Sequence, residues 1–358
     1  MMYGEIKMEC SKMLKPKPAD GERLGFGKRF TDHMFLMDYT EGKGWHDPRI
    51  VPYGPIALDP AAMVLHYGQA TFEGLKAFRD ADGAIRLFRP EQNARRMNRS
   101  NDRIGIPELD EKFFVEALRR IVALDGNWVP TAAGASLYAR PFVIATEPAL
   151  GVRASSRYLF AIILSPVDNY YGDQTLKPID IYVEDAYVRA VRGGTGAAKT
   201  PGNYASSLKA QSMAKQKGYD QVLWLDGVEK KYVEEVGSMN VFFKLGSTVV
   251  TPELSGSILA GIMRDSVIRL LRKWDVPIEE RRLSITELIE AAADGQLEEA
   301  FGTGTAAVIS PIGGLYWHGG SADVGGRVVG QLSRKLYDAI TGIQTGKLAD
   351  EFGWTENC

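Results

Sequence analysis

The spacing of apolar residues changes along the chain between two periods, and each period predicts one kind of secondary structure. In segment 110–124 apolar residues recur every three to four positions, as on one helix face, and Gly126 follows as a stop signal. Further helices are predicted at 91–103, 206–217, 257–273 and 328–340, and one is predicted to begin at the capping box Ser284-Ile-Thr-Glu287. Short apolar runs bounded by turn residues predict strands at 84–88, 136–146, 158–164, 221–225, 240–245 and 248–251.

The order of these elements predicts an α+β fold. Strands follow one another instead of alternating with helices, which disfavours a doubly wound parallel sheet. The length of 358 residues suggests about two domains. We expect a small α/β domain at 1–167, an interdomain loop at 168–178, which is polar and ends at Pro178, and a larger domain at 179–358. The Lys- and Pro-rich first twenty residues are expected to form a loosely held arm.

The amino-acid composition argues against nucleic acids and membranes as partners. The chain has 43 basic and 45 acidic residues, whereas nucleic-acid and anionic-membrane binders carry a basic excess, so neither partner is expected. The longest apolar run, 158–164, is too short to cross a bilayer, and the N-terminus lacks a signal-peptide pattern. Only Cys10 and Cys358 occur, near opposite ends of the chain, so no disulfide framework is possible beyond one bridge between them. A reducing, cytoplasmic location is favoured. The histidines have no metal-ligand spacing, and no metal is expected.

The glycine-rich segment RGGTGAAKT at 192–200 is the first candidate for chemistry. It matches a phosphate-binding P-loop only in part, since Ala198 stands where a glycine belongs and Pro201-Gly202 interrupts the following helix. An alternative is that Lys199 is buried among small residues that leave room for a planar ligand. A desolvated lysine becomes a nucleophile for carbonyls, as in a Schiff base with pyridoxal phosphate (PLP). For Lys199 taken alone, a surface lysine on a glycine loop is the competing interpretation.

A candidate acid follows further along the chain. Glu235 stands in the segment EEVGSMN, directly before an expected strand. An acid that faces the pyridine nitrogen of PLP keeps this nitrogen protonated, so that the ring can accept electrons. Two adjacent glutamates are also common at a solvated strand edge. The presence of Lys199 upstream favours the catalytic interpretation of Glu235.

Several segments together resemble the fold-type IV PLP enzymes, and specifically the branched-chain amino-acid aminotransferases. The motifs that carry this resemblance are FGKRFTDHM (26–34), ATFEGLKAF (70–78), LFRP (87–90), LYARP (137–141), GTGAAKTPGNYA (194–205), EEVGSMN (234–240) and FGTGTA (301–306). They occur in the family's order from about residue 24 to the C-terminus, and several motifs in order are far more specific than one. The resemblance implies the two-domain fold of the D-amino-acid aminotransferase group and PLP as the cofactor.

The resemblance also implies roles for the cofactor-binding positions. Lys199 would form the Schiff base and move the proton, Glu235 would face the pyridine nitrogen, and Tyr204 would hydrogen-bond the 3′ oxygen. Arg96, rather than its neighbour Arg95, would bind the phosphate, because a guanidinium pairs with phosphate oxygens bidentately. The other implied cofactor contacts are Ser238, Ile262, Met263 and Thr305. Some relatives carry threonine in place of the methionine, but backbone amides at a helix start would still bind an anion.

A substrate pocket is implied by aromatic, basic and small residues: Phe26, Phe72, Lys76, Tyr138, Arg140, Tyr170, Thr305 and Ala306. Burial against aromatic walls suits leucine, isoleucine and valine side chains, at about 25 cal/mol per Å² of apolar surface. The second carboxylate of glutamate needs a partner, for which Arg140 or the tyrosine hydroxyls are candidates. For any single phenylalanine, a place in the ordinary core is the competing interpretation.

We therefore expect a reversible, ping-pong transaminase that moves an amino group between L-leucine, L-isoleucine or L-valine and 2-oxoglutarate, giving branched 2-oxo acids and L-glutamate. A D-amino-acid aminotransferase or a 4-amino-4-deoxychorismate lyase would share the fold and the cofactor, although the Tyr138-x-Arg140 pair favours the branched-chain enzyme. A nucleotide-binding protein that uses residues 193–200 and a catalytically silent PLP carrier are alternatives of other classes. The resemblance implies a homodimer with the active site near the dimer interface.

Overall fold

The structure is a computed structural model that describes residues 3–19, 22–168 and 176–358. The chain divides into two compact units. Unit 1 comprises Met1–Gln174, Ala198–Pro201 and Gly342–Cys358, and unit 2 comprises Thr175–Ala197 and Gly202–Thr341. Each unit combines a sheet with helices, which confirms the α+β class.

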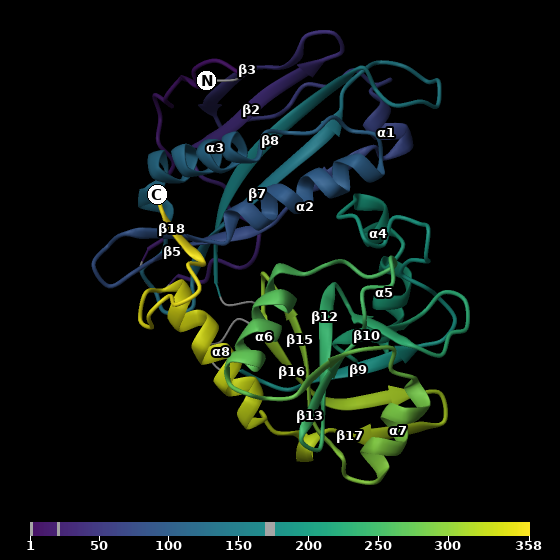
Figure 1. Ribbon diagram of the computed structural model, residues 1–358. Helices are drawn as coiled ribbons and strands as arrows, with labels where there is room; N and C mark the ends of the chain where they lie inside the picture. Colours follow the sequence, from purple (N-terminus) through teal and green to yellow (C-terminus); the bar gives the residue numbers. More distant parts are fainter. Residues whose placement is uncertain (1–2, 20–21, 169–175) are drawn as a thin grey trace. The chain divides into compact units, whose positions relative to one another are not determined.

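The strands of unit 1 form one sheet in the order β1-β3-β2-β8-β7-β5-β6-β18, with β4 paired to β7 (Figure 1). Its strands are β1 (Lys7–Met8), β2 (His33–Thr40), β3 (Gly44–Pro52), β4 (Ala70–Phe72), β5 (Leu75–Arg79), β6 (Ile85–Phe88), β7 (Ser136–Ala145), β8 (Arg157–Val167) and β18 (Thr355–Asn357). Its helices are α1 (Met63–Tyr67), α2 (Pro90–Arg103) and α3 (Glu111–Leu124), with the 3-10 turn η1 (Gly126–Trp128). Neighbouring strands in this sheet are antiparallel, apart from the parallel pair of β1 and β3.

Helices α2 and α3 cover one face of this sheet (Figure 1). The predicted apolar face of α3 is confirmed, because Phe114, Leu118 and Ile121 are buried in the core. Asp110 caps this helix by accepting a hydrogen bond from the Phe113 N–H at 2.7 Å. Side chains alternate between the two faces of a strand. Leu137 and Ala139 of β7 point into the core, so Tyr138 and Arg140 lie on the opposite face. That alternation positions two of the expected substrate-binding residues.

The strands of unit 2 run in the order β11-β10-β9-β16-β15-β12-β13-β14, and an additional pairing of β11 with β12 closes part of this sheet into a ring. Its strands are β9 (Ile179–Glu184), β10 (Gln221–Leu225), β11 (Val233–Val236), β12 (Met239–Leu245), β13 (Thr248–Thr251), β14 (Ile278–Glu280), β15 (Leu297–Gly304), β16 (Val308–Trp317) and β17 (Gly320–Asp323), which pairs with β16. Its helices are α5 (Leu208–Gln216), α6 (Ile262–Lys273) and α7 (Ile285–Ala293), with the 3-10 turn η2 (Gly325–Arg327). The helices α4 (Pro201–Ala205) and α8 (Gln331–Gln344) each contain residues assigned to both units.

Two predicted helix starts are wrong, and the capping box is right. The helix predicted from Ser257 begins at Ile262, because the Ser257 hydroxyl and carbonyl make tertiary hydrogen bonds and Gly261 has an extended backbone. The helix predicted from Val328 begins at Gln331, because Val328 is extended, with φ −113° and ψ 164°. Ser284 accepts a hydrogen bond from the Glu287 N–H at 3.0 Å, as the capping box predicts.

The two ends of the chain also differ from expectation. The N-terminal segment is not a loose arm in residues 3–19, because Ile6 is buried and β1 pairs with β3. The Lys15 N–H also donates to Asp32 Oδ1 at 2.8 Å. Residues 342–358 belong to unit 1 and not to the C-terminal domain expected at 179–358, because β18 pairs with β6. Most of the expected interdomain loop, 169–175, lies outside the described residues.

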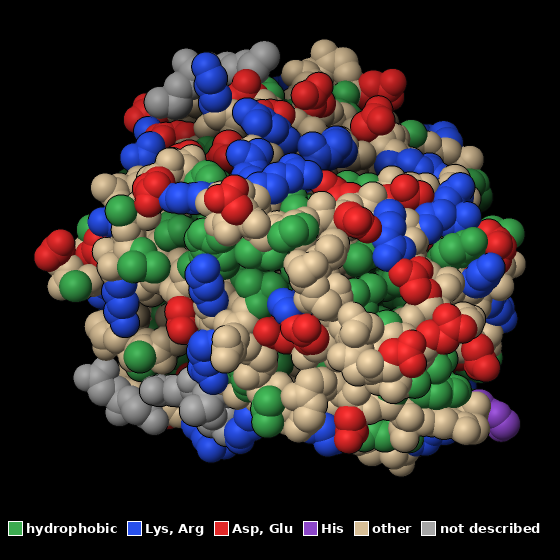
Figure 2. Space-filling model, turned by 60° about the horizontal axis from the view of Figure 1, so that its bottom comes forward, with side chains coloured by type: hydrophobic (Ala, Val, Ile, Leu, Met, Phe, Trp, Pro, Cys, Tyr) green, Lys and Arg blue, Asp and Glu red, His purple; other side chains and the backbone are tan. Residues whose placement is uncertain are grey.

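Surface charge is mixed. Basic and acidic side chains are interspersed over the face that Figure 2 draws, in keeping with a net charge of −2. In the described part of the chain, no helix is both long and apolar enough to cross a membrane. The same residues contain no group of three or more His, Cys, Asp or Glu side chains that could hold a metal ion.

Candidate active site

The backbone of Lys199 is held on both sides by groups of unit 1. Its N–H donates to Ser100 Oγ on α2 at 2.9 Å, and its carbonyl accepts from the N–H of Phe72, at the end of β4, at 3.1 Å. These two bonds place the Lys199 amine 4.8 Å from the centre of the Phe72 ring. The lysine is half-buried, less enclosed than the sequence suggested.

Four of the expected substrate-binding residues gather in unit 1. The rings of Phe26 and Tyr138 meet edge to face with centres 5.0 Å apart. Arg140 donates to Tyr138 Oη at 3.0 Å, and its guanidinium lies 4.8 Å from the centre of the Phe72 ring. A Cβ at Gly74 would lie 1.9 Å from Tyr138 Oη, so this tight approach requires glycine. The group combines apolar walls with a guanidinium and a phenol.

Lys76 lies on the same face as this aromatic and basic group. It stands on β5 directly opposite Tyr138 in the strand register, and opposed residues share a face of the sheet. Its side chain is buried, and burial lowers the Lys76 pKa to about 8, so part of the population is neutral in mildly alkaline solution. Tyr170, the remaining aromatic residue of the expected pocket, lies outside the described residues.

The arginine expected at the phosphate is paired with an acid that sequence reasoning missed. Arg96 Nε lies 2.7 Å from Glu73 Oε1 and Arg96 Nη2 lies 2.8 Å from Oε2, while Asn93 donates to Oε2 at 2.7 Å. Burial alone would raise the Glu73 pKa, but the charge and hydrogen bonds of Arg96, with the charge of Lys199, hold it below its usual value. Arg95 is exposed and pairs with Glu111. The signal for Glu73 is an acid inside the apolar ATFEGLKAF run.

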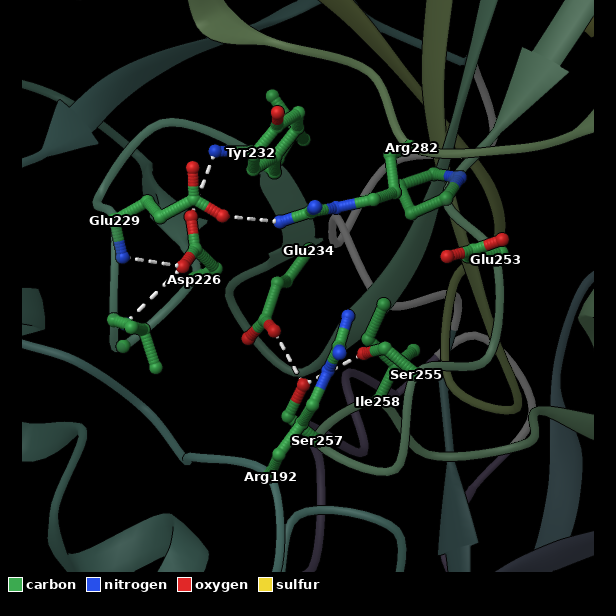
Figure 3. A pocket seen from close by; sticks show the side chains of 14 residues that line it. Arg192, Asp226, Glu229, Tyr232, Glu234, Glu253, Ser255, Ser257, Ile258 and Arg282 are labelled. Carbon is green, nitrogen blue, oxygen red and sulfur yellow. Dashed lines mark hydrogen bonds and ion pairs between the residues drawn. The ribbon is translucent and has the colours of Figure 1, made fainter.

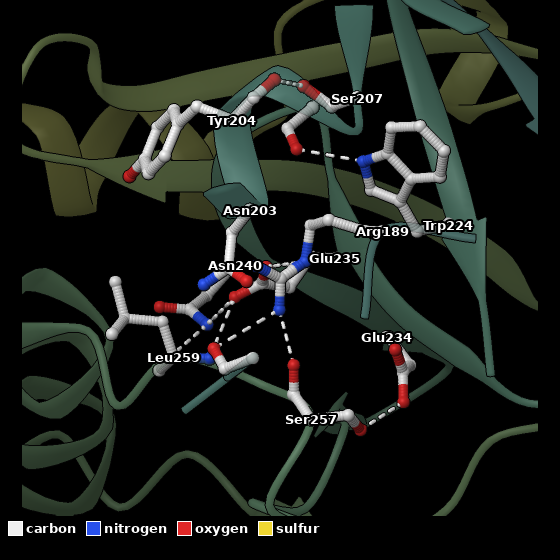
Figure 4. Close-up of polar contacts among 12 residues, drawn as sticks. Arg189, Asn203, Tyr204, Ser207, Trp224, Glu234, Glu235, Asn240, Ser257 and Leu259 are labelled. Carbon is white, nitrogen blue, oxygen red and sulfur yellow. Dashed lines mark hydrogen bonds and ion pairs between the residues drawn. The ribbon is translucent and has the colours of Figure 1, made fainter. Parts of the chain in front are cut away.

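In unit 2, Glu235 is buried on β11 and surrounded by hydrogen-bond donors (Figure 4). Its Oε1 accepts from Asn240 Nδ2 at 3.2 Å and from the Leu259 N–H at 3.1 Å. Arg189 Nε lies 2.6 Å from its Oε2 as an ion pair, although the N–H does not align as a hydrogen bond. A buried acid with a cation and two N–H donors is stabilised as a carboxylate.

Arg189 and Asn240 are supporting residues that sequence reasoning missed. Arg189 Nη2 donates to the carbonyls of Ser257 and Gly196, which fixes its guanidinium beside Glu235. Asn240 lies in the EEVGSMN motif, which could have drawn attention to it, whereas no local pattern marks Arg189. Asn240 is paired with Glu235 across the β11–β12 hairpin, whereas Arg189 reaches Glu235 from a distant loop only in the folded unit.

The expected phosphate-binding helix start lies close to the same acid. Helix α6 begins at Ile262, followed by the buried Met263, and no side chain of the described residues caps its N-terminus at Gly261. A Cβ at Gly261 would lie 2.0 Å from Asn240 Oδ1, so glycine is required there. Asn240 thereby joins Glu235 to the loop that leads into α6. The backbone N–H groups of this helix start suit an anion.

The remaining expected residues lie at turns. Tyr204 is half-buried on α4, and the neighbouring Asn203 exchanges hydrogen bonds of 2.7 and 2.8 Å with Thr195 of the glycine-rich segment. Ser238 is exposed in the turn between β11 and β12. Thr305 and Ala306 are half-buried in the turn that follows β15.

Comparison with known proteins now places the chain. Residues 70–314 match the family of class IV amino-transferases. The chain is 59% identical over 350 residues to branched-chain-amino-acid aminotransferase 2 of Bacillus subtilis, covering 98% of this chain and 96% of the relative. Branched-chain-amino-acid transaminase 1 of the same organism is also 59% identical, with 98% of each chain covered.

Solved structures of branched-chain amino acid aminotransferases have the same fold as this chain. The Escherichia coli branched-chain amino acid aminotransferase superposes with a TM-score of 0.75 at 26% identity, covering 91% of this chain and 98% of that one. The Thermobaculum terrenum enzyme in its PLP form has the same fold, with a TM-score of 0.72 at 24% identity over 90% of this chain and 97% of that one. The chain belongs to the class IV aminotransferase family. Within this family it groups with the branched-chain-amino-acid aminotransferases, which confirms the resemblance and the assignment as a transaminase.

Proposed function

We propose that this chain transfers the amino group of L-leucine, L-isoleucine or L-valine reversibly to 2-oxoglutarate, with PLP as cofactor. The observation that carries the proposal is the setting of Lys199, whose amine lies beside Phe72 while Arg140 contacts the same ring. Relatives at 59% identity carry the branched-chain name. Together these support a primary amine that reacts with a carbonyl next to a pocket for an apolar carboxylic acid.

The residues present fit PLP, which when bound supplies a protonated pyridine ring that accepts electrons from Cα of the amino acid. Glu235 suits the ring nitrogen because Arg189, Asn240 and Leu259 stabilise its carboxylate. The N-terminal turn of α6, at Ile262 and Met263, suits the phosphate, as does the guanidinium of Arg96. In this proposal Tyr204 donates to the 3′ oxygen, and Ser238 and Thr305 complete the cofactor contacts.

Lys199 has two tasks in the proposed reaction. Its amine would hold the cofactor until the amino acid replaces it. The freed amine would then act as base by taking the proton from Cα, and as acid by supplying a proton to C4′ of the cofactor. The backbone bonds to Ser100 and Phe72 hold the Lys199 main chain in place while the side chain moves. The Lys199 amine lies over the Phe72 ring, a cation–π contact worth about 0.5–1 kcal/mol.

The two kinds of substrate would be recognised by different contacts in the same pocket. Branched side chains pack against Phe26, Phe72 and Tyr138, whereas the second carboxylate of 2-oxoglutarate pairs with Arg140 or the tyrosine hydroxyl. Lys76, on the same sheet face, adds positive charge at neutral pH. Thr305 and Ala306 are proposed at the α-carboxylate. One pocket thus accepts both partners in turn, as a ping-pong reaction requires.

We also propose a cytoplasmic homodimer. The large apolar side chains of Leu65, Tyr67, Leu150 and Val152 are exposed. They lie on two segments that are close together, because the Tyr67 hydroxyl donates a hydrogen bond to the Leu150 carbonyl. A second copy of the chain would cover them. Both cysteines are free thiols, which suits a reducing compartment. Light scattering of the wild type and of Leu65→Glu with Val152→Glu tests the dimer, which the double variant is expected to weaken.

Absorbance spectroscopy tests the reaction. The protein with PLP is expected to show a visible band that L-leucine, without any oxo acid, converts to a shorter-wavelength form. Lys199→Ala should show neither behaviour, whereas Lys209→Ala, which changes an exposed lysine of α5, should behave as wild type. A response to D-alanine in place of L-leucine would identify a D-amino-acid aminotransferase, and pyruvate release from aminodeoxychorismate would identify a lyase.

A further inference from the structure

A pocket that has no part in the proposed reaction lies wholly within unit 2 (Figure 3). It is bounded by the turn at 226–229, the loop at 252–258 and the start of the glycine-rich segment. Its volume is about 150 Å³. A water molecule needs about 10–15 Å³ of such space, so the pocket has room for about ten waters or one small organic molecule.

One wall of this pocket carries a buried acid with an unsatisfied oxygen. Glu234 precedes Glu235 on β11, and consecutive side chains of a strand point to opposite faces. Glu234 Oε1 accepts a hydrogen bond from Ser257 Oγ, whereas its buried Oε2 has no hydrogen-bond partner among the described residues. Burial raises the Glu234 pKa. Leaving a buried acceptor unpaired costs about 1–3 kcal/mol, so a donor placed at Oε2 would be stabilising.

The pocket also contains a positively charged side chain, that of Arg192. Arg192 is exposed, lines the pocket, and makes no side-chain hydrogen bond or ion pair in the part of the chain that the structure describes. Its charge attracts Glu234 without an ion pair between them. Arg282 differs, because it pairs with Glu229 at 2.8 Å and stacks 3.4 Å above the Tyr232 ring. Arg192 is therefore the cation in this pocket that remains available for a ligand.

We propose that this pocket binds a small aliphatic α-amino acid, with its ammonium group on Glu234 Oε2 and its carboxylate on Arg192. A zwitterion matches both charges at once, whereas a simple amine or a simple carboxylate would leave one of them without a partner. Apolar residues of the lining offer contacts for an aliphatic side chain: Val228, Val233, Pro252 and Ile258. This binding site goes beyond the proposed transamination and does not require it.

Occupation of the pocket acts on the candidate active site through one residue. Ser257 donates its hydroxyl to Glu234, and its carbonyl accepts from Arg189, which pairs with Glu235 (Figure 4). A ligand that draws Glu234 toward its ammonium shifts Ser257 and hence the guanidinium that holds Glu235. The bound amino acid is therefore expected to change the turnover rate, because Glu235 is the acid proposed for the ring nitrogen.

Titration calorimetry tests the binding, with 2-aminoisobutyrate as the probe. This amino acid has no hydrogen on Cα and cannot be transaminated, and reduction of the holoenzyme with borohydride blocks Lys199. We expect one site per chain. Glu234→Gln keeps an acceptor for Ser257 but loses the charge, and Arg192→Ala removes the cation. Each is expected to weaken binding about tenfold or more. Glu298→Gln, which removes an exposed charge on β15, is the matched control and should bind as wild type.

The outcomes separate the site from the catalytic pocket. Saturable binding that both pocket variants weaken supports the proposal, and isobutyrate or isobutylamine should then bind more weakly than the amino acid. Absence of saturable binding, or equal binding by Arg192→Ala and the wild type, overturns it. Arg192 is exposed, so its variant is not expected to unfold, and thermal melting checks this. The titration does not depend on transaminase activity, so failure of the proposed function would appear only in the L-leucine assay.

A kinetic readout tests the coupling. With unreduced holoenzyme, 2-aminoisobutyrate bound at this pocket is expected to change kcat even when L-leucine is saturating, whereas competition at the active site raises only KM. The kcat effect should disappear in Arg192→Ala. An effect on KM alone would refute the link through Ser257 and Arg189.

Discussion

The guanidinium of Arg189 lies 2.6 Å from the carboxylate of Glu235, and both side chains are almost fully buried. Each partner is also held by neighbouring polar groups. The carbonyls of Ser257 and Gly196 accept from Arg189, and Asn240 donates to Glu235. A residue that no sequence motif marks thus holds the acid that the motifs do mark.

Breaking this ion pair is expected to affect stability strongly. Arg189→Met leaves the Glu235 carboxylate buried without its cation and should lower the free energy of unfolding by about 3–5 kcal/mol. Arg189→Lys restores a charge but not the second donor, and should recover part of the loss. Urea unfolding measures both. In the control Arg269→Met, an exposed pair with Asp265 is lost, which should cost about 1 kcal/mol or less. Equal losses in Arg189→Met and this control would contradict the structural role of the pair.

Two glycine substitutions test the packing at the start of α6. Gly261→Ala places a Cβ 2.0 Å from Asn240 Oδ1 and should destabilise the protein by about 1–3 kcal/mol while weakening PLP retention. Gly202→Ala on α4 meets nothing within 4 Å and should be neutral or slightly stabilising. Thermal melting and the absorbance of bound PLP after dialysis compare the two. If Gly202→Ala lost PLP as readily as Gly261→Ala, the contact with Asn240 would not be the cause.

The buried pair of Glu73 and Arg96 predicts a pH dependence of stability. Arg96 and its hydrogen bonds outweigh burial and lower the Glu73 pKa below 4.5, so the folded state binds this proton less readily than the unfolded state. The contribution to stability is complete above pH 4.5 and is lost as pH falls through the folded pKa. Urea unfolding between pH 3 and 7 should show this slope, and Glu73→Gln should flatten it. An unchanged slope in Glu73→Gln would assign it to other carboxyl groups.

Lys76 predicts a dependence of the opposite kind at alkaline pH. Burial lowers its pKa from 10.5 to about 8, so between these values the unfolded state binds more protons than the folded state. Stability should therefore rise with pH across this window, by about 3 kcal/mol. Lys76→Met is expected to be more stable than wild type at pH 7 and to lack the rise. A rise of the same size in Lys76→Met would show that another group is responsible.

Much of the local structure followed from the sequence. The β10 and β13 bounds, the apolar face of α3 and the cap at Ser284 were predictable because turn residues, helical spacing and capping chemistry act over a few positions. The family was predictable because several motifs occur in order, and these motifs include Lys199 and Glu235. The same local reasoning misplaced the starts of α6 and α8, where tertiary hydrogen bonds and an extended backbone prevail.

The amino-acid sequence by itself indicated many of the elements, the α+β class and the family, and it singled out Lys199 and Glu235 as the candidate lysine and acid. Only the tertiary structure decided that Glu73 pairs with Arg96, that Arg189 holds Glu235, and that residues 342–358 join unit 1. It also decided that Glu234 faces a separate pocket. The physical reason is that these contacts join residues far apart in the chain, and burial, which gives them their strength, exists only once the chain has folded.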